Sequence, residues 1–143
     1  MIESLIHNGI TLAFIIRADY HADGVNFFTP DSYSQQVAYM NHKAGHKIDA
    51  HTHNPLKREV EFTQEVLVIR KGRLRADFYT DTHEYIESRI LGAGDVILLV
   101  SGGHGFEVLE DLEMIEIKQG PYAGDGDKTK FQGISATEVK LKK

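Results

Sequence analysis

The stretch Glu65–Thr80, EVLVIRKGRLRADFYT, decides the fold. It is rich in Val, Ile, Leu and Phe, and its apolar residues recur with a period close to two, as side chains do on one face of a β-strand. Lys71-Gly72 interrupts it, and glycine supplies the positive φ that a tight turn requires. The pattern predicts two strands, Glu65–Arg70 and Arg73–Thr80, joined as a hairpin at Lys71-Gly72.

Short runs of the same kind lie on both sides of this hairpin, separated by polar or glycine-containing turns. About nine strands with turns every 8 to 12 residues or so are typical of an all-β barrel or sandwich. Ile2–Asn8 is the one segment that we interpret as a short helix. The further strands are expected at Thr11–Arg17, Gly24–Phe28, Gln36–Met40, Glu84–Leu91, Asp95–Val100, Gly105–Glu110 and Leu112–Lys118.

The chain has 143 residues, the size of one domain, and shows no internal repeat or linker. We therefore predict a single domain over residues 1–143, with N-terminal strands in 1–40, a core in 41–118 and a C-terminal arm in 119–143. Lys140, Lys142 and Lys143 are interpreted as a solubilising tail of that arm.

Composition excludes several classes of function. The net charge of −5 argues against binding to nucleic acid, because the polyanion would be repelled. The absence of cysteine removes disulfides, thiolate zinc sites and cysteine nucleophiles. The longest apolar run, Ile10–Ile16, is far shorter than the roughly 20 residues of a membrane span, and no signal peptide is evident. We expect a cytoplasmic protein that does not bind a membrane.

Histidines carry the chemical information in this sequence. His51 and His53 are two residues apart, so on a strand both imidazoles would lie on one face and form half of a metal site. Glu65 opens the next predicted strand and His104 opens a later one. If that face lines a barrel, three imidazoles and one carboxylate can converge there.

These residues follow a spacing that resembles the cupin superfamily, whose first motif is G-x5-H-x-H-x3-4-E-x6-G and whose second is G-x5-P-x-G-x2-H-x3-N. The matching positions are Gly45, His51, His53, Glu65, Gly72, Gly94, Gly102 and His104. The chain departs from the pattern in having eleven residues between His53 and Glu65, so that Glu59 and Gln64 compete with Glu65. Val100 and Val108 also replace the proline and asparagine of the second motif.

The resemblance implies a jelly-roll β-barrel of cupin type that pairs as a homodimer. It implies one divalent metal ion (Fe, Mn, Ni, Co or Zn) held by His51, His53, Glu65 and His104. The expected substrate is a small polar metabolite, sugar-like or carboxylate. Two reactions fit: isomerisation or epimerisation, with Glu65 or a nearby histidine as the catalytic proton carrier, and dioxygenation, which demands iron.

A weak likeness of His53–Gly72 to cupins that isomerise nucleotide-linked keto sugars favours carbohydrate metabolism. The alternative is a non-enzymatic cupin that binds or senses a small molecule. Arg58 is the candidate for binding an anionic group, because a guanidinium grips carboxylate or phosphate in two places. Gln36, Gln119 and Tyr122 are further candidate substrate-binding residues, and each also has a purely structural interpretation in a loop or at a strand end.

Overall fold

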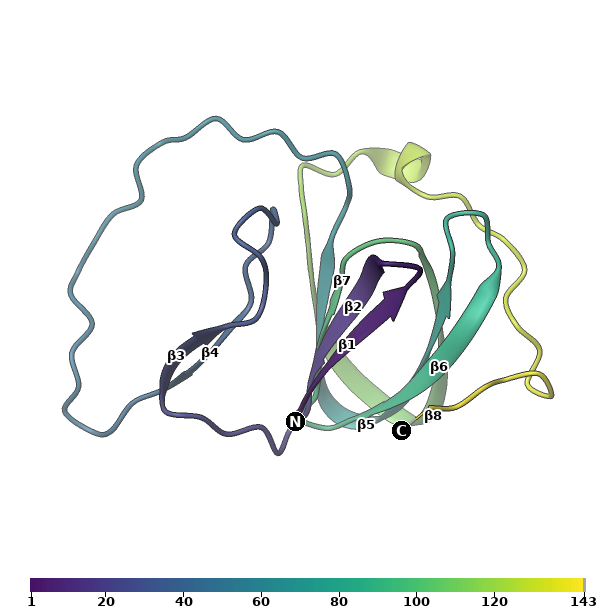
Figure 1. The fold of residues 1–143 in the computed structure, drawn as a ribbon, viewed down its shortest axis with the longest axis horizontal. Coiled ribbons are helices and arrows are strands. Elements are labelled where there is room, and N and C mark those ends of the chain that lie inside the picture. Colours follow the sequence, from purple (N-terminus) through teal and green to yellow (C-terminus); the bar gives the residue numbers. More distant parts are fainter. Residues whose placement is uncertain (143) are drawn as a thin grey trace. The chain divides into compact units, whose positions relative to one another are not determined.

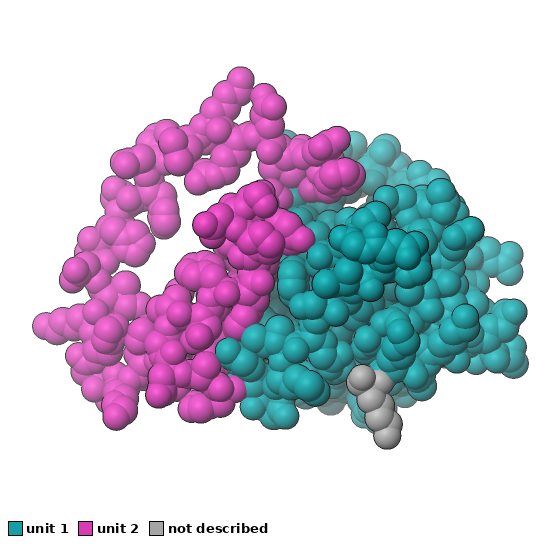
Figure 2. Space-filling view, viewed as in Figure 1, with its two compact units in different colours: residues 1–20, 63–143 teal, residues 21–62 magenta. Residues whose placement is uncertain are grey.

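The computed structural model describes residues 1–142 of the chain. It forms two compact units, one made of Met1–Tyr20 with Thr63–Lys143 and the other of His21–Phe62 (Figure 2). Almost all regular structure is β-strand, and the one helical element in this range is the 3-10 helix η1 (Gly124–Asp127). The predicted all-β class is therefore confirmed.

The larger unit contains one six-stranded antiparallel sheet that curls into a half-barrel (Figure 1). The strand order is β1-β2-β7-β5-β6. β8 pairs with β5 along its other edge, because β6 and β7 share the first edge between them. The strands are β1 (Ile2–His7), β2 (Ile10–Ile16), β5 (Glu65–Tyr79), β6 (Tyr85–Gly92), β7 (Val96–Leu99) and β8 (Gly103–Lys118).

The smaller unit contains two antiparallel strands, β3 (Gly24–Phe27) and β4 (Ala38–Asn41). β3 lies where the sequence predicts a strand, and β4 begins two residues later than expected. The loop between them is held by Gln36, whose side-chain oxygen accepts a hydrogen bond of 2.8 Å from Thr29 Oγ1. After β4, residues 42–64 form neither helix nor strand.

The predicted hairpin at Lys71-Gly72 is wrong. The chain continues through it as a single strand, β5, and the two strands predicted in Gly105–Lys118 are likewise one strand, β8. Register shifts between β5 and β8 cluster around Gly72, as in a β-bulge, which bends the strands that contain it. A Cβ on Gly72 (φ +81°) would lie 2.1 Å from the Asp111 carbonyl oxygen. Glycine is therefore required here for close backbone approach and not for a hairpin turn.

The bend also shifts the alternation of side chains by one residue. Leu67 and Ile69 before it, and Leu74, Ala76 and Phe78 after it, all belong to the buried core. A strand without the shift would have turned one half of its apolar side chains to the opposite face. The inner face of the sheet is thus apolar along both halves of β5, together with Leu5, Leu12, Ala13, Ile15, Leu91, Ile97 and Leu99 from the other strands.

The helix predicted at Ile2–Asn8 is also wrong, because this segment is strand β1. β1 and β2 form a hairpin whose two-residue turn is Asn8-Gly9, with φ of +49° and +79°. Asn-Gly with two positive φ angles is typical of a type I′ hairpin turn. Asn8-Gly9 is therefore the sequence signal for this hairpin. The segment Ile2–His7 is too short for its alternation of apolar and polar residues to distinguish a strand from a helix.

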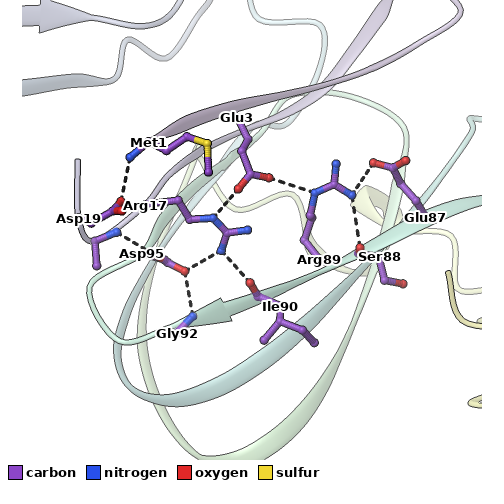
Figure 3. Close-up of polar contacts among 11 residues, drawn as sticks. Met1, Glu3, Arg17, Asp19, Glu87, Ser88, Arg89, Ile90, Gly92 and Asp95 are labelled. Atoms are coloured by element: carbon purple, nitrogen blue, oxygen red, sulfur yellow. Dashed lines mark hydrogen bonds and ion pairs between the residues drawn. The ribbon is translucent and has the colours of Figure 1, made fainter. Parts of the chain in front are cut away.

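A network of charged side chains links β1 and β6, the two ends of the strand order (Figure 3). Glu3 on β1 accepts hydrogen bonds from Arg17 Nε at 2.6 Å and from Arg89 Nε on β6 at 3.1 Å. Arg89 also pairs with Glu87 at 2.6 Å, and Arg17 with Asp95 at 2.9 Å. We call Glu3, Arg17, Glu87, Arg89 and Asp95 the closing network, because they join the edges of the curled sheet without backbone pairing.

The C-terminal arm is hydrogen-bonded to the sheet near its end, while Lys140 and Lys142 are exposed, so their interpretation as a solubilising tail stays a prediction. The Lys140 carbonyl accepts a hydrogen bond of 2.9 Å from the Ser88 amide, and the Lys142 amide donates one of 3.1 Å to the Ser88 carbonyl. The Lys142 ammonium pairs with Glu87 of the closing network. Lys143 lies outside the described residues.

In residues 1–142 there is no helix of the length and apolarity needed to cross a membrane.

Candidate functional site

Glu65 and His104 meet on the inner face of the curled sheet. Glu65 is the first residue of β5, and His104 is the second residue of β8, opposite Phe78 near the far end of β5. Their side chains nevertheless approach to 3.2 Å between Oε2 and Nε2. The bend at Gly72 explains this contact, because it folds the paired strands β5 and β8 so that their two ends face each other.

The electrostatics of this pair favour an ionised carboxylate. The Glu65 side chain is only 8% exposed, whereas that of His104 is 31% exposed. The hydrogen bond from His104 lowers the pKa of Glu65, burial opposes this, and the charges of His104, Lys118 and Lys128 lower it further. An ionised carboxylate only accepts hydrogen bonds, so His104 donates from Nε2 and a neutral ring keeps a lone pair on Nδ1. Nδ1 is not engaged by Glu65, whose Oε2 contacts Nε2.

Lys118 is a third member of the site that sequence reasoning missed. It lies directly opposite Glu65 in the β5–β8 register. Its ammonium is 3.5 Å from Glu65 Oε1 and 3.8 Å from Glu116 Oε1. The negative charge of Glu65 raises the pKa of Lys118. Only the pairing of β5 with β8 reveals this neighbour, because no motif in the sequence relates the two positions.

Gln119 fixes the chain at the base of the site. Its side-chain oxygen accepts a hydrogen bond of 2.9 Å from the backbone N–H of Gln64. Its own backbone N–H donates one of 3.3 Å to the backbone carbonyl of Gln64. These bonds tie the residue before Glu65 to the residue after Lys118. Gln119 therefore positions the site through the backbone, and its expected contact with substrate stays a prediction.

Partly exposed apolar side chains continue the inner face beyond His104. Phe106 and Val108 follow it at alternate positions of β8 and pair in register with the core residues Ala76 and Leu74. The ring of Phe106 lies 5.3 Å from that of His104. Both apolar side chains remain substantially exposed, so the acid–base pair adjoins an apolar surface open to solvent.

The predicted metal ligands His51 and His53 lie in the irregular segment after β4 and not on a strand. Their ring centroids are 5.2 Å apart, and His51 Nδ1 is hydrogen-bonded to the Asp49 carbonyl at 2.9 Å. They belong to the smaller unit, whereas Glu65 and His104 belong to the larger one. No group of three or more His, Asp or Glu side chains in residues 1–142 is arranged to hold a metal ion.

The donor atoms themselves suit a metal of the predicted kind. Imidazole nitrogen and carboxylate oxygen are ligands of divalent iron, manganese, nickel, cobalt and zinc. Glu65 and His104 present one of each within 3.2 Å. His51 and His53 present two neighbouring imidazoles. Each pair by itself supplies two ligands, and a catalytic site of this kind usually needs three.

The remaining predicted substrate-binding residues have the following surroundings. Arg58 is exposed in the segment after β4, and Tyr122 is almost fully exposed in the arm after β8. Gln36 donates from Nε2 to the carbonyls of Pro30 and Tyr33, at 2.9 and 3.0 Å, so its amide is engaged within its own loop. A role in substrate binding stays a prediction for all three.

No protein-family model matches the chain, and no match is found among curated proteins or solved structures. Membership of the cupin superfamily therefore stays a prediction.

Proposed function

We propose that the chain is a cupin-type enzyme that isomerises or epimerises a small polar metabolite by moving a proton next to a carbonyl group. The observation that supports this most is the contact of 3.2 Å between Glu65 and His104. A buried carboxylate that orients a more exposed imidazole is a common arrangement for general acid–base catalysis.

The chemistry follows from the roles of the two ring nitrogens. Glu65 holds the Nε2 proton of His104, which leaves Nδ1 to take a proton from the carbon beside the substrate carbonyl. The electron pair of the broken C–H bond moves to the carbonyl oxygen and forms an enediolate. Return of the proton by His104 to the neighbouring carbon, with the hydroxyl proton passing to the former carbonyl oxygen, gives the isomer. The epimer forms when water donates a proton to the opposite face of the enediolate and His104 releases its own proton to solvent. No electron donor or acceptor is needed.

Hydrogen exchange tests this proposal. A nucleotide-linked 4-keto-hexose and a ketohexose phosphate are incubated with the protein in deuterium oxide, and the proton beside the carbonyl is followed by NMR. We expect exchange with at least one of them, reduced at least about a hundredfold in His104→Gln, which removes the proton carrier. His7→Gln, at a partly buried position at the end of β1 and outside the site, is the control and keeps the wild-type rate. Equal rates in His104→Gln and wild type contradict the proposal.

A second candidate is a divalent metal centre formed by His51, His53, Glu65 and His104. It is favoured by the proximity of the His51 and His53 rings in addition to the Glu65–His104 contact. Such a metal would act as a Lewis acid on the substrate carbonyl or, if it is iron, would allow dioxygenation. These four side chains would hold it, and Glu65 would then be a ligand and not a partner of Nε2.

Elemental analysis after incubation with zinc, nickel, manganese and ferrous iron separates the two candidates. The metal centre requires about one ion per chain, and alanine at either His51 or His104 should weaken binding at least about tenfold. Equal metal content in wild type and both variants excludes this centre.

We further propose that the half-barrel is a cupin jelly roll, that the chain acts in the cytoplasm in carbohydrate metabolism, and that it pairs as a homodimer. The support for pairing is the long strand β8, which has one β-strand neighbour in the described chain and exposes several apolar side chains. If exchange and metal binding both fail while a small molecule still binds, the chain is a binding or sensing module.

A further inference from the structure

Lys118 stands out on an acidic strand. It is the only lysine or arginine of β8, whose other charged side chains are Glu107, Glu110, Asp111, Glu113 and Glu116. The whole chain carries a net charge of −5. Two of these carboxylates, Glu107 and Glu110, are paired with Arg75 and Arg73 of β5. The Lys118 ammonium is the one Lys or Arg cation that β8 itself provides, and it lies at the Glu65 end of the strand, where it can attract an anion.

The ion pairs of Lys118 are loose. Its distances of 3.5 Å to Glu65 and 3.8 Å to Glu116 exceed the roughly 2.7–2.9 Å of a charge-assisted hydrogen bond. An ammonium group has three hydrogen-bond donors. Its side chain is 25% exposed, so the group can be reached from solvent. The carboxylates of Glu65 and Glu116 thus balance the charge of Lys118 without short hydrogen bonds. The N–H donors of its ammonium can still form short bonds to a ligand.

The position of Lys118 is defined by its backbone. It pairs in register with Glu65, and the hydrogen bonds between Gln119 and Gln64 hold the next residue. Lys118 and His104 approach different oxygens of the same carboxylate, at Oε1 and Oε2 respectively. A group bound to Lys118 therefore lies close to the proton carrier.

We propose that Lys118 binds an oxyanion group of the substrate, a carboxylate or a phosphate, and thereby selects an anionic metabolite for the Glu65–His104 pair. This inference rests on the proposed function only for the identity of the bound molecule as a substrate. The binding of an oxyanion at Lys118 is a separate property and can be measured by itself.

Inorganic phosphate and acetate serve as probes of the two oxyanions. Each is titrated into the full chain at constant ionic strength, while the NMR signals of the Lys118 side chain and the His104 ring are followed. We expect at least one anion to shift both sets of signals in a saturable way. Lys118→Met should weaken the affinity at least about tenfold, because it removes the charge and keeps most of the stem. Lys118→Arg should keep the affinity within about threefold.

The controls separate this inference from the proposed reaction. Lys71→Met removes an exposed lysine at the bend of β5 and should leave anion binding unchanged. His104→Gln should reduce hydrogen exchange at least about a hundredfold and keep anion binding within about threefold, because Lys118 remains. Binding of phosphate alone supports a phosphorylated metabolite, and binding of acetate alone supports a carboxylate. The inference is overturned if neither anion shifts the signals, or if Lys118→Met binds as tightly as wild type.

Discussion

Two clusters of charged side chains in the same curled sheet differ in how completely they are satisfied. In the closing network, Arg17 and Arg89 contact Glu3 at 2.6 and 3.1 Å, and both arginines are at most 19% exposed. In the candidate site, His104 and Lys118 contact Glu65 at 3.2 and 3.5 Å, and they are 31% and 25% exposed. The side chains of Glu3 and Glu65 are similarly shielded, at 13% and 8% exposed, so the difference lies in the cations.

The exposure and distances of the cations indicate that the closing network is structural and that the candidate site can react with a ligand. Guanidinium groups present several donors in a fixed plane, so Arg17 and Arg89 can satisfy Glu3 and further acceptors at once. An imidazole and an ammonium at longer distances leave hydrogen-bonding capacity for a ligand. We therefore expect substitutions in the closing network to reduce stability, and substitutions in the site to reduce binding and reactivity with little loss of stability.

The largest expected effect is that of Arg89→Met. It leaves the buried Glu87 and the partly buried Glu3 with fewer partners, and breaking a buried ion pair costs about 3–5 kcal/mol of unfolding free energy. The control is Arg73→Met, which removes an exposed pair with Glu110 and should cost less than about 1 kcal/mol. Urea denaturation at pH 7 measures both. Equal costs for the two variants would remove the distinction between the clusters.

Gly72→Ala should have the next largest effect and should damage both stability and the site. The added methyl group collides with the Asp111 carbonyl at a residue with φ of +81°, and such strain costs about 1–3 kcal/mol. Because the bend brings Glu65 to His104, oxyanion binding and hydrogen exchange should fall as well. Gly126→Ala, where a Cβ meets nothing within 4 Å, is the matched control. A stable Gly72→Ala protein with full binding would show that the bend does not require glycine.

Acid should destabilise the protein mainly through the closing network. Burial raises the pKa of Glu3, but the hydrogen bonds and charges of Arg17 and Arg89 lower it further, so its net pKa is below the ordinary 4.5. The pKa of Glu87 is lowered in the same way by Lys142 and Arg89. A carboxyl group with a lowered folded pKa stabilises the fold above its unfolded pKa, and this contribution is lost as the pH falls below about 4.5.

Unfolding free energies measured between pH 7 and pH 3 check this dependence. Wild type should lose stability in the acid range, and the loss should be smaller in Arg89→Met, which has already lost the interaction. The same slope in both proteins would mean that other carboxyl groups cause the acid sensitivity.

The smallest expected change in stability is that of His104→Gln, below about 1 kcal/mol, because the ring is partly exposed and forms a single ion contact. Thermal unfolding next to the exchange assay shows whether stability and reactivity separate at this residue. A loss as large as that of Arg89→Met would make His104 a structural residue.

Period-two alternation made most strands of the sheet predictable, because most of these strands contribute apolar side chains to one core. The exceptions depend on backbone geometry. Glycine at position 72 is compatible with a hairpin turn and with a bulge, and the sequence does not distinguish them. Asn8-Gly9 indicates a hairpin, and this signal outweighs the helical interpretation of the short segment before it. Glu65 and His104 could be proposed as neighbours from motif spacing alone. Lys118 could not, because its place opposite Glu65 depends on register shifts at the bend that no periodicity reveals.

The candidate site depends on the hydrogen bond between Glu65 and His104, and NMR of the imidazole rings tests this bond most directly. Proton–nitrogen spectra of the histidine rings are compared between wild type and Glu65→Gln at neutral pH. We predict a hydrogen-bonded Nε2 proton on His104 in wild type that moves or disappears in Glu65→Gln, while the ring signals of His7, which lies on β1 outside the site, are unchanged. Identical His104 ring signals in the two proteins would contradict the account.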